Sequence, residues 1–261
     1  MPHNIVVMRN IAKRHKLIIT ELEKNGYVQV QELSSILGVT EVTIRKDLKE
    51  LESRKLLYRS HGGASIHSAL IGDRHIDEKE KIQTEEKNNI AEYAVQLIEK
   101  DDRIIIASGT TVLALARKIT DHLPLTVITP SVKVTSILSY VNNIEIIQLG
   151  GNIRKSSASA IGAYAENLLK DMMCNKLFIG VDGIDIEHGL TTSNLSEAHL
   201  NQCMLKSAQK IIVLTDSTKF GRRGFGKICD INQIDQIITD KNAPSNTVQI
   251  MRDRGIDVVL V

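Results

Sequence analysis

The sequence has few cysteines and no long apolar run, and both absences exclude classes of protein. Its three cysteines, Cys174, Cys203 and Cys229, are odd in number and too widely spaced for a metal site or a disulfide framework. We interpret them as free thiols in a reducing cytosol. No apolar run approaches the roughly 20 residues that a membrane helix needs, and the N-terminus lacks the apolar core of a signal peptide. We therefore expect a cytoplasmic protein with no membrane contact, no metal and no cofactor.

The net charge is small but unevenly distributed along the chain. It is +2 over 261 residues, yet residues 1–66 hold 11 Lys+Arg against 7 Asp+Glu, an excess of +4, and the remainder holds 22 against 24. Basic residues gather where a protein contacts phosphates, so the N-terminal part is the candidate for nucleic-acid binding. The length allows two domains. We expect a DNA-binding head at 1–66, a polar linker at 67–83 and a larger domain at 84–261.

Residues 33–64 have the pattern of a helix-turn-helix followed by a basic wing. The apolar residues at helical spacing in the first helix are Leu33, Ile36 and Leu37. Gly38 and Val39 interrupt them, and Thr40 offers an N-cap oxygen to the free amides of a second helix. Before this motif we expect a helix over residues 10–24 and a short strand over residues 27–30, which could pair with the wing.

The second helix has one apolar and one polar face. Its apolar residues recur at +4 and +3, and they are Ile44, Leu48 and Leu51. The polar face suits the DNA major groove, which admits a helix and offers acceptors to cations. An ordinary solvated helix face has the same appearance, so the helix alone leaves both readings open. The candidate DNA contacts on or beside this face are Glu41, Thr43, Arg45, Lys46 and Lys49.

The wing favours the interpretation that this face binds DNA. Residues 56–64 form a short β-type run in which Arg59 and His61 precede Gly62 and Gly63. Adjacent glycines permit a tight turn, so the run predicts a hairpin whose basic residues lie along phosphates. We add Arg59 and His61 to the candidate DNA contacts.

These motifs resemble the DNA-binding signature of the DeoR family of bacterial sugar-catabolism repressors. The matching residues are Val39-Thr40, Thr43-Ile44-Arg45-Lys46-Asp47-Leu48, Leu51-Glu52, Arg59 and His61-Gly62-Gly63-Ala64. One position departs from the family: Lys55 stands where a glycine usually ends the recognition helix. The resemblance implies a winged helix-turn-helix that binds a double-stranded DNA operator.

From residue 84 onward the pattern alternates between helices and short apolar strands. The expected strands are at 103–107, 124–129, 144–149, 176–181, 210–215, 236–239 and 257–261. Buried runs rich in Ile and Val with helices between them predict an α/β domain with a mostly parallel sheet. Ligands of such sheets bind beyond the carboxyl ends of the strands, so the loops there are the candidate site.

Several of these loops contain residues suited to an anionic sugar. The loop Ser108-Gly109-Thr110-Thr111 precedes a helix, where free amides and hydroxyls suit a phosphate, although a plain N-cap has the same residues. Gly150 and Gly151 precede Arg154, which could clamp an oxyanion, although a glycine pair is often only a turn. The remaining candidates are carboxylates for sugar hydroxyls and one cation, namely Asp182, Asp185, Glu197 and Lys219.

The DeoR resemblance extends over this half and implies a sugar-phosphate effector site. The matching stretches are Glu86-Lys87, Gly109-Thr110-Thr111, Gly150-Gly151 with Arg154, Gly180 to Asp185, Gly189-Leu190-Thr191 and Asp216 through Gly221. This half of the family is similar in fold to ribose-5-phosphate isomerase, and several stretches look most like galactosamine-type amino-sugar repressors. Two positions depart: Ala107 replaces a common aspartate and Pro130 a common asparagine. The missing carboxylate leaves open whether the domain responds to an effector.

Three interpretations of function agree with these patterns. The first is a non-enzymatic repressor, working as a homo-oligomer, that a phosphorylated sugar releases from the operator of a carbohydrate operon. The second is a sugar-phosphate isomerase with an accessory DNA-binding head, for which Asp182, Asp185, Glu197 and Lys219 would supply the chemistry. A third is a degenerate pocket used only for oligomer contacts. Fold similarity does not transfer activity, and the DNA-binding head favours the repressor.

Overall fold

The computed structural model describes residues 10–261 except residues 26, 55, 61, 66–72 and 122. The chain divides into two compact units, Met1–Leu70 and Ile71–Val261. Within the described ranges, no helix is long and apolar enough to cross a membrane.

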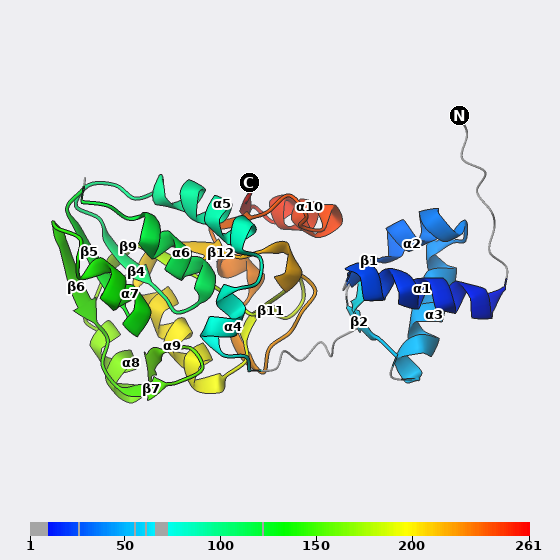
Figure 1. Ribbon diagram of the computed structural model, residues 1–261, viewed down its shortest axis with the longest axis horizontal. Coiled ribbons are helices and arrows are strands. Elements are labelled where there is room, and N and C mark those ends of the chain that lie inside the picture. The colour runs from blue at the N-terminus through cyan, green and yellow to red at the C-terminus, as the bar shows by residue number, and fades with distance from the viewer. Residues whose placement is uncertain (1–9, 26, 55, 61, 66–72, 122) are drawn as a thin grey trace. The chain divides into compact units, whose positions relative to one another are not determined.

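The first unit combines helices with a small antiparallel sheet (Figure 1). Its elements are α1 (Ile11–Asn25), β1 (Tyr27–Gln29), α2 (Val30–Leu37), α3 (Glu41–Ser53), β2 (Tyr58–Ser60) and β3 (Gly63–Ser65). The strand order is β1-β3-β2, with both pairs antiparallel. The predicted pairing of the first strand with the wing is therefore confirmed. Buried side chains from all three helices and the sheet form one core.

The turn between α2 and α3 forms as the sequence predicts. Gly38 ends α2 in the left-handed conformation, with φ of 63°, which glycine adopts without a Cβ clash. The Thr40 side chain then accepts a hydrogen bond from the Thr43 backbone N–H at 3.3 Å and caps α3. The apolar stripe of α3 is buried against α2, with Ile44 and Leu48 at most 1% exposed. The two helices are thus held by one cap and one apolar seam.

One residue expected in this seam is on the surface instead. Ile36 is 63% exposed, whereas Leu33 and Leu37 are 1% and 3% exposed. The helix begins earlier than expected, at Val30, which is also buried. The buried stripe of α2 therefore follows Val30, Leu33 and Leu37 at +3 and +7, and Ile36 points away from it.

The second unit is built on a seven-stranded sheet in which every neighbouring pair is parallel. Its order is β15-β14-β12-β9-β4-β5-β6. The strands are β4 (Arg103–Ile106), β5 (Leu125–Thr129), β6 (Ile144–Gln148), β9 (Cys174–Ile179), β12 (Ala208–Leu214), β14 (Gln236–Thr239) and β15 (Asp257–Leu260). This sheet confirms the predicted fold class of a helix-turn-helix head with a mostly parallel α/β body.

Helices cover both faces of this sheet (Figure 1). One face is covered by α5 (Thr84–Val95), α6 (Thr110–Lys118) and α7 (Val132–Leu138). The other is covered by α8 (Ala163–Leu169), α9 (Leu195–Lys206) and α10 (Ser245–Asp253). Successive strand residues alternate between the two cores, as Ile104 and Ile105 do, which is why the strands are apolar throughout.

Smaller elements surround the carboxyl ends of the strands. They are α4 (Ile76–Glu80), the hairpin of β7 (Asn152–Arg154) and β8 (Ser159–Ile161), the sheet of β10 (Gly183–Asp185), β11 (Gly189–Thr192) and β13 (Gly226–Cys229), and the short 3-10 helices η1 (Ser217–Lys219) and η2 (Ile231–Gln233). They carry three of the predicted effector residues, Arg154, Asp185 and Lys219.

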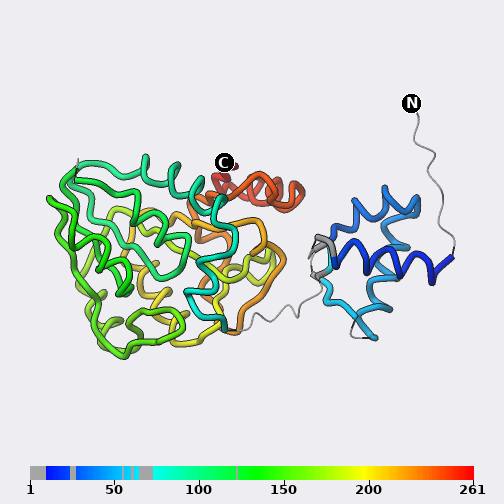
Figure 2. The backbone as a smooth tube through the Cα atoms, in the orientation of Figure 1, coloured from blue at the N-terminus to red at the C-terminus, as the bar shows by residue number. Residues whose placement is uncertain are grey.

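The segment expected to be a linker, residues 67–83, is partly structured. From residue 73 it belongs to the second unit, and in Figure 2 it is the cyan trace beside the green helices. Ile76 is only 2% exposed, and its backbone N–H donates to the Ser156 carbonyl at 2.7 Å. The predicted linker is therefore wrong at its C-terminal end, because one apolar residue among the charges fastens this segment to the body.

Candidate functional site

The outward face of α3 presents basic and apolar side chains to solvent. Lys46 and Lys49 are exposed, and no hydrogen bond or ion pair of either side chain occurs among the described residues. Arg45 is also exposed, and its guanidinium lies 2.5 Å from the carboxylate of Glu41, one turn earlier. Val42 is 59% exposed on the same helix. This face has cations for phosphates or guanine and an apolar contact for a thymine methyl.

The wing is tied to α3 by an arginine that was predicted to contact DNA. The Arg59 backbone N–H donates to Glu52 at 2.9 Å, and its guanidinium donates to the same carboxylate at 2.8 Å. Arg59 therefore positions the wing against the recognition helix in this structure. His61, the other predicted wing contact, lies outside the described residues.

A buried ion pair locks α3 to α1, and the sequence assigned no role to its carboxylate. Asp47 is 5% exposed and accepts a hydrogen bond from Arg14 Nη2 at 2.8 Å, while His15 Nε2 lies 3.2 Å away. The hydrogen bond to Asp47 raises the pKa of Arg14. Asp47 is three residues after the buried Ile44, and that spacing is the signal that could have placed it on the inner face.

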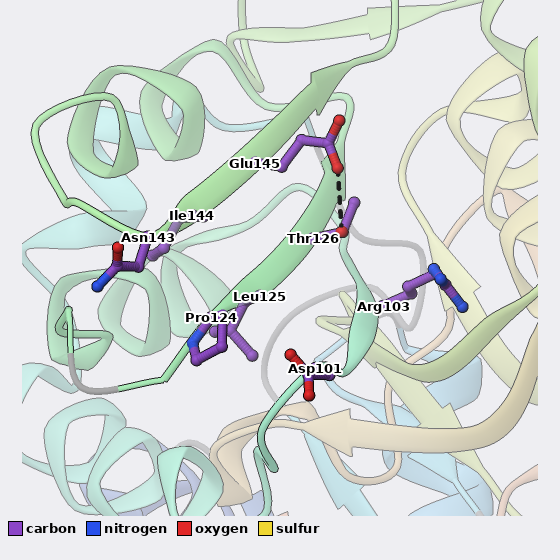
Figure 3. A pocket seen from close by; sticks show the side chains of 8 residues that line it. All are labelled: Asp101, Arg103, Pro124, Leu125, Thr126, Asn143, Ile144 and Glu145. Atoms are coloured by element: carbon purple, nitrogen blue, oxygen red, sulfur yellow. Dashed lines mark hydrogen bonds between the residues drawn. The ribbon is translucent and has the colours of Figure 1, made fainter.

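In the second unit, one open pocket lies at the amino ends of β4, β5 and β6 (Figure 3). It has a volume of about 490 Å³. Its lining residues are Asp101, Arg103, Pro124, Leu125, Thr126, Asn143, Ile144 and Glu145. None of the predicted site residues lies there, because all of them follow the carboxyl ends of strands.

At the carboxyl end of β4, the predicted phosphate loop forms the start of α6. Gly109 has φ of 130°, a conformation that side chains with a Cβ rarely adopt. Thr110 and Thr111, in the first turn of the helix, are 8% and 7% exposed. The Ser108 hydroxyl donates to Glu197 Oε1 at 2.7 Å. The loop therefore offers free helix amides beside a network of buried polar groups.

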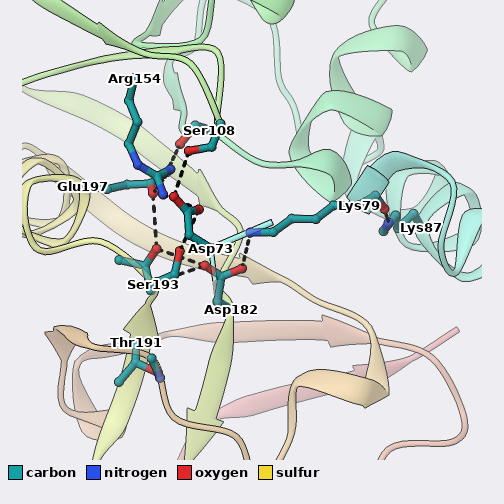
Figure 4. A network of polar contacts seen from close by, with 12 residues as sticks. Asp73, Lys79, Lys87, Ser108, Arg154, Asp182, Thr191, Ser193 and Glu197 are labelled. Atoms are coloured by element: carbon teal, nitrogen blue, oxygen red, sulfur yellow. Dashed lines mark hydrogen bonds and ion pairs between the residues drawn. The ribbon is translucent and has the colours of Figure 1, made fainter. Parts of the chain in front are cut away.

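Arg154 and Glu197 form the centre of that network (Figure 4). Arg154 Nη1 lies 3.0 Å from Glu197 Oε2, and the two side chains are 9% and 12% exposed. Burial raises the pKa of Glu197, and the nearby Arg154 charge opposes that shift. Arg154 Nη2 lies 2.5 Å from Asp73 Oδ1, yet this buried nitrogen makes no hydrogen bond of good geometry. The guanidinium is only partly satisfied.

Asp182 joins the same network from the loop after β9. Its carboxylate lies 2.7 Å from Lys79 Nζ and accepts hydrogen bonds from the Ser193 N–H at 3.1 Å and the Thr192 hydroxyl at 3.2 Å. Burial alone would raise the pKa of Asp182, but the charge and hydrogen bond of Lys79 outweigh it and lower the pKa to about 2. Asp182 is therefore an anion throughout the physiological range.

Two further cations stand near Asp182 without a direct partner. Burial lowers the pKa of Lys219, with the Asp216 and Asp182 charges opposing that shift. Burial also lowers the pKa of Arg222, and the Arg74 charge adds to the effect. Neither side chain makes a hydrogen bond or ion pair within the described parts of the chain. Both residues are half-buried, and desolvated cations without partners are costly, so this corner favours an anionic ligand.

A buried cation, Lys87, fastens α4 to α5. Lys87 is 6% exposed, and its ammonium donates to the carbonyls of Lys79 and Ile82, at 2.5 Å each. Burial lowers its pKa to about 8, with the Asp216 charge opposing the shift. Its role is to hold the turn after α4, and so to position Lys79.

Comparisons with known proteins place the chain in a family. Residues 82–241 match the DeoR C terminal sensor domain, and residues 14–69 match the DeoR-like helix-turn-helix domain. The chain belongs to the DeoR family. A putative aga operon transcriptional repressor of Escherichia coli O157:H7 is 38% identical over 252 residues, with 96% of this chain and 94% of the relative covered. The glycerol-3-phosphate regulon repressor of Escherichia coli K12 is 29% identical, with 95% and 98% covered.

Two solved structures are more distantly similar. A probable sor operon regulator from Shigella flexneri has 12% identity and a TM-score of 0.44, with 78% of this chain and 97% of that chain covered. A ribose 5-phosphate isomerase A from Methanocaldococcus jannaschii has 16% identity and a TM-score of 0.39, with 51% and 53% covered. Structural similarity at this level supports no conclusion about function.

Within this DeoR-family chain, the predicted effector residues do not all come together. Asp185 is 2% exposed and belongs to a separate cluster, where Arg223 lies 2.9 Å away and the backbone N–H groups of Glu187 and His188 donate at 2.9 Å. Its carboxylate shapes the turn between β10 and β11 and does not reach Arg154 or Lys79.

The glycine pair is likewise a turn rather than a cradle. Gly150 and Gly151 are exposed between β6 and β7, and a Cβ on Gly151 would lie 2.7 Å from the Ile161 carbonyl oxygen. The pair therefore lets the β7–β8 hairpin close and bring Arg154 inward. Ala107, where the family has an aspartate, is 1% exposed in an apolar core cluster. The residues that sequence reasoning missed are Asp73, Lys79, Ser193 and Arg222.

Proposed function

We propose that this chain represses transcription of a carbohydrate catabolic operon and is released from its operator by a phosphorylated sugar. The observation that carries the proposal is the pairing of two sites in one chain. An exposed basic helix lies in one unit. A buried polar cluster lies at the strand ends of the other, beside two half-buried cations that have no ion pair within the described parts of the chain. Relatives that match over nearly the whole chain are named as repressors of the aga operon and of the glycerol-3-phosphate regulon.

For the DNA site, we assign contacts to α3 and the wing. Lys46 and Lys49 have exposed ammonium groups, with no ion pair among the described residues, that suit phosphates. Arg45 suits a guanine edge once it leaves Glu41, and Thr43 lies at the start of the helix that enters the groove. Arg59 and His61 belong to the wing, which would follow the backbone. One short helix covers few base pairs, so we propose a symmetric homo-oligomer in the cytoplasm that reads repeated half-sites.

For the effector site, we assign the phosphate to the corner formed by the first turn of α6 with Arg154, Lys219 and Arg222. Helix amides, two threonine hydroxyls, the partly satisfied guanidinium of Arg154, and two cations that have no hydrogen bond or ion pair among the described residues offer donors to an anion there. Asp182 and Glu197 are acceptors for sugar hydroxyls or for an ammonium group. An amino-sugar phosphate fits both sets, in keeping with the relative named for the aga operon.

The direct test is to select operator DNA with the purified protein and then titrate sugar phosphates into the complex. We expect an amino-sugar phosphate to lower operator affinity by about 5- to 150-fold, as typical coupling energies imply. The ligand must bind one arrangement better than the other, because equal affinity for both shifts nothing. The unphosphorylated sugar is the control. Turnover of the sugar phosphate in the same mixture would favour the isomerase instead.

A further inference from the structure

Asp73 holds the start of the second unit against the charged cluster (Figure 4). One of its oxygens lies 2.5 Å from Arg154 Nη2 and accepts a hydrogen bond from the Ser193 hydroxyl at 3.4 Å. The other accepts from the Ser156 hydroxyl at 3.0 Å. The carboxylate thus occupies a place with one cation and two hydroxyl donors, which is the chemistry that an anionic ligand group requires.

The contact between Asp73 and Arg154 is imperfect. The Asp73 side chain is 45% exposed, whereas the Arg154 side chain is 9% exposed, and Arg154 Nη2 has no hydrogen bond of good geometry. A buried guanidinium nitrogen gains from a better-placed acceptor. An anion in this place would satisfy Nη2 and repel the carboxylate of Asp73.

The chain beyond Asp73 is anchored separately and more firmly. Ile76 is buried, and its N–H is bonded to the Ser156 carbonyl. Lys133 pairs with Asp77 at 2.5 Å and with Glu80 at 3.1 Å, and Arg117 also pairs with Glu80. An anion attracts Lys79 instead of repelling it. Loss of the Asp73 contact therefore leaves α4 in place.

We propose, on the basis of the function proposed above, that Asp73 is a ligand-sensitive clasp. An anionic group of the effector displaces its carboxylate from Arg154, Ser156 and Ser193, and residues 73–75 leave the body while α4 stays. Occupancy of the site thereby frees three residues, up to about 10 Å of extended chain, from the body.

The clasp competes with the ligand, so removing it strengthens anion binding. We expect the full-length Asp73→Asn variant to bind glucosamine 6-phosphate and inorganic phosphate about 2- to 5-fold more tightly than the natural chain, by calorimetry, because partly exposed ion pairs have energies of this order. Glu78→Gln is the matched control. It removes the same charge from the same segment, and the exposed Glu78 side chain makes no hydrogen bond or ion pair within the described residues.

Trypsin cleavage after Arg74 reports the release itself, because Arg74 is exposed directly beside the clasp. We expect glucosamine 6-phosphate to speed this cleavage in the natural chain. The Asp73→Asn variant should be cleaved fast even without ligand. Mass spectrometry identifies the fragment that begins at His75. If Asp73→Asn and Glu78→Gln match the natural chain in affinity and in cleavage, the clasp is wrong while effector binding stands. If no sugar phosphate binds any of the three proteins, the proposed effector function is overturned as well.

Discussion

The two units of this chain hold their charged residues in opposite environments. On α3, Arg45 is 56% exposed, and Lys46 and Lys49 are exposed beside it. At the strand ends, the side chains of Arg154, Asp182 and Glu197 are 9–12% exposed. Salt screens exposed charges beyond about 10 Å, whereas buried charges are screened far less. The head therefore suits a polyanion held by many weak contacts, and the body suits one small ligand held by a few strong ones.

The largest effect on stability is expected at Asp47, a charged residue of the head that is buried as the charges of the body are. Asp47→Ala leaves the Arg14 guanidinium buried without its carboxylate, so we expect the head to lose about 3–5 kcal/mol of stability. Thermal or urea unfolding followed by circular dichroism measures this loss. The control is Glu50→Ala, which removes an exposed pair with Arg54 on the same helix. A change below about 0.5 kcal/mol for Asp47→Ala would place this pair among the weak surface contacts.

Lys46→Ala tests the exposed side of the comparison. If Lys46 contacts phosphate, the variant should weaken binding to all sequences alike and reduce the salt slope by about 1. If Lys46 contacts a base, the variant should lose about 1–3 kcal/mol of binding free energy at one operator position. Fluorescence anisotropy at several salt concentrations separates the two. Lys16→Ala, an exposed lysine of α1, is the charge-matched control, and unchanged binding by Lys46→Ala would remove it from the interface.

Thr110→Val tests the buried side. The substitution nearly preserves shape but removes a hydroxyl donor from the first turn of α6, so we expect effector affinity to drop by about 1–2 kcal/mol, or roughly 5- to 30-fold. DNA binding without effector should be unchanged. Thr126→Val, at the opposite end of the sheet, is the control. Equal effector affinity by calorimetry for the variant and the natural chain would mean that the phosphate lies elsewhere.

The last effect expected is a pH dependence of stability from Lys87. Burial lowers its pKa to about 8 from an ordinary value of 10.5. The folded chain therefore binds fewer protons than the unfolded chain between these values, and stability should rise as pH increases from about 8 to 10.5. We expect Lys87 to contribute about 2 kcal/mol to this rise between pH 8 and pH 10. Urea unfolding at pH 8 and pH 10 measures it, and a Lys87→Met variant with the same rise would contradict the assignment.

Local patterns account for most of the fold and about half of the charged cluster. Thr40, Gly38 and the stripe of α3 were predictable because caps, turns and helical spacing act over a few residues. The predicted strands form because buried apolar runs have few alternatives. Ser108, Arg154, Asp182 and Glu197 meet because parallel strands end at one edge of the sheet. Ile36 was misplaced because the start of α2, and with it the buried side, depends on β1.

By itself, the sequence determined the two-unit organisation, the face of α3 and the edge of the sheet where polar loops gather. The tertiary structure alone decided which of those residues meet. Ser156 bonds Asp73 across 83 positions, and Lys79 bonds Asp182 across 103. No local pattern encodes such pairs, because each depends on how separate elements dock. The same docking keeps Asp185 out of the cluster, although only three positions separate it from Asp182. Arg223 and the turn between β10 and β11 hold the Asp185 carboxylate elsewhere.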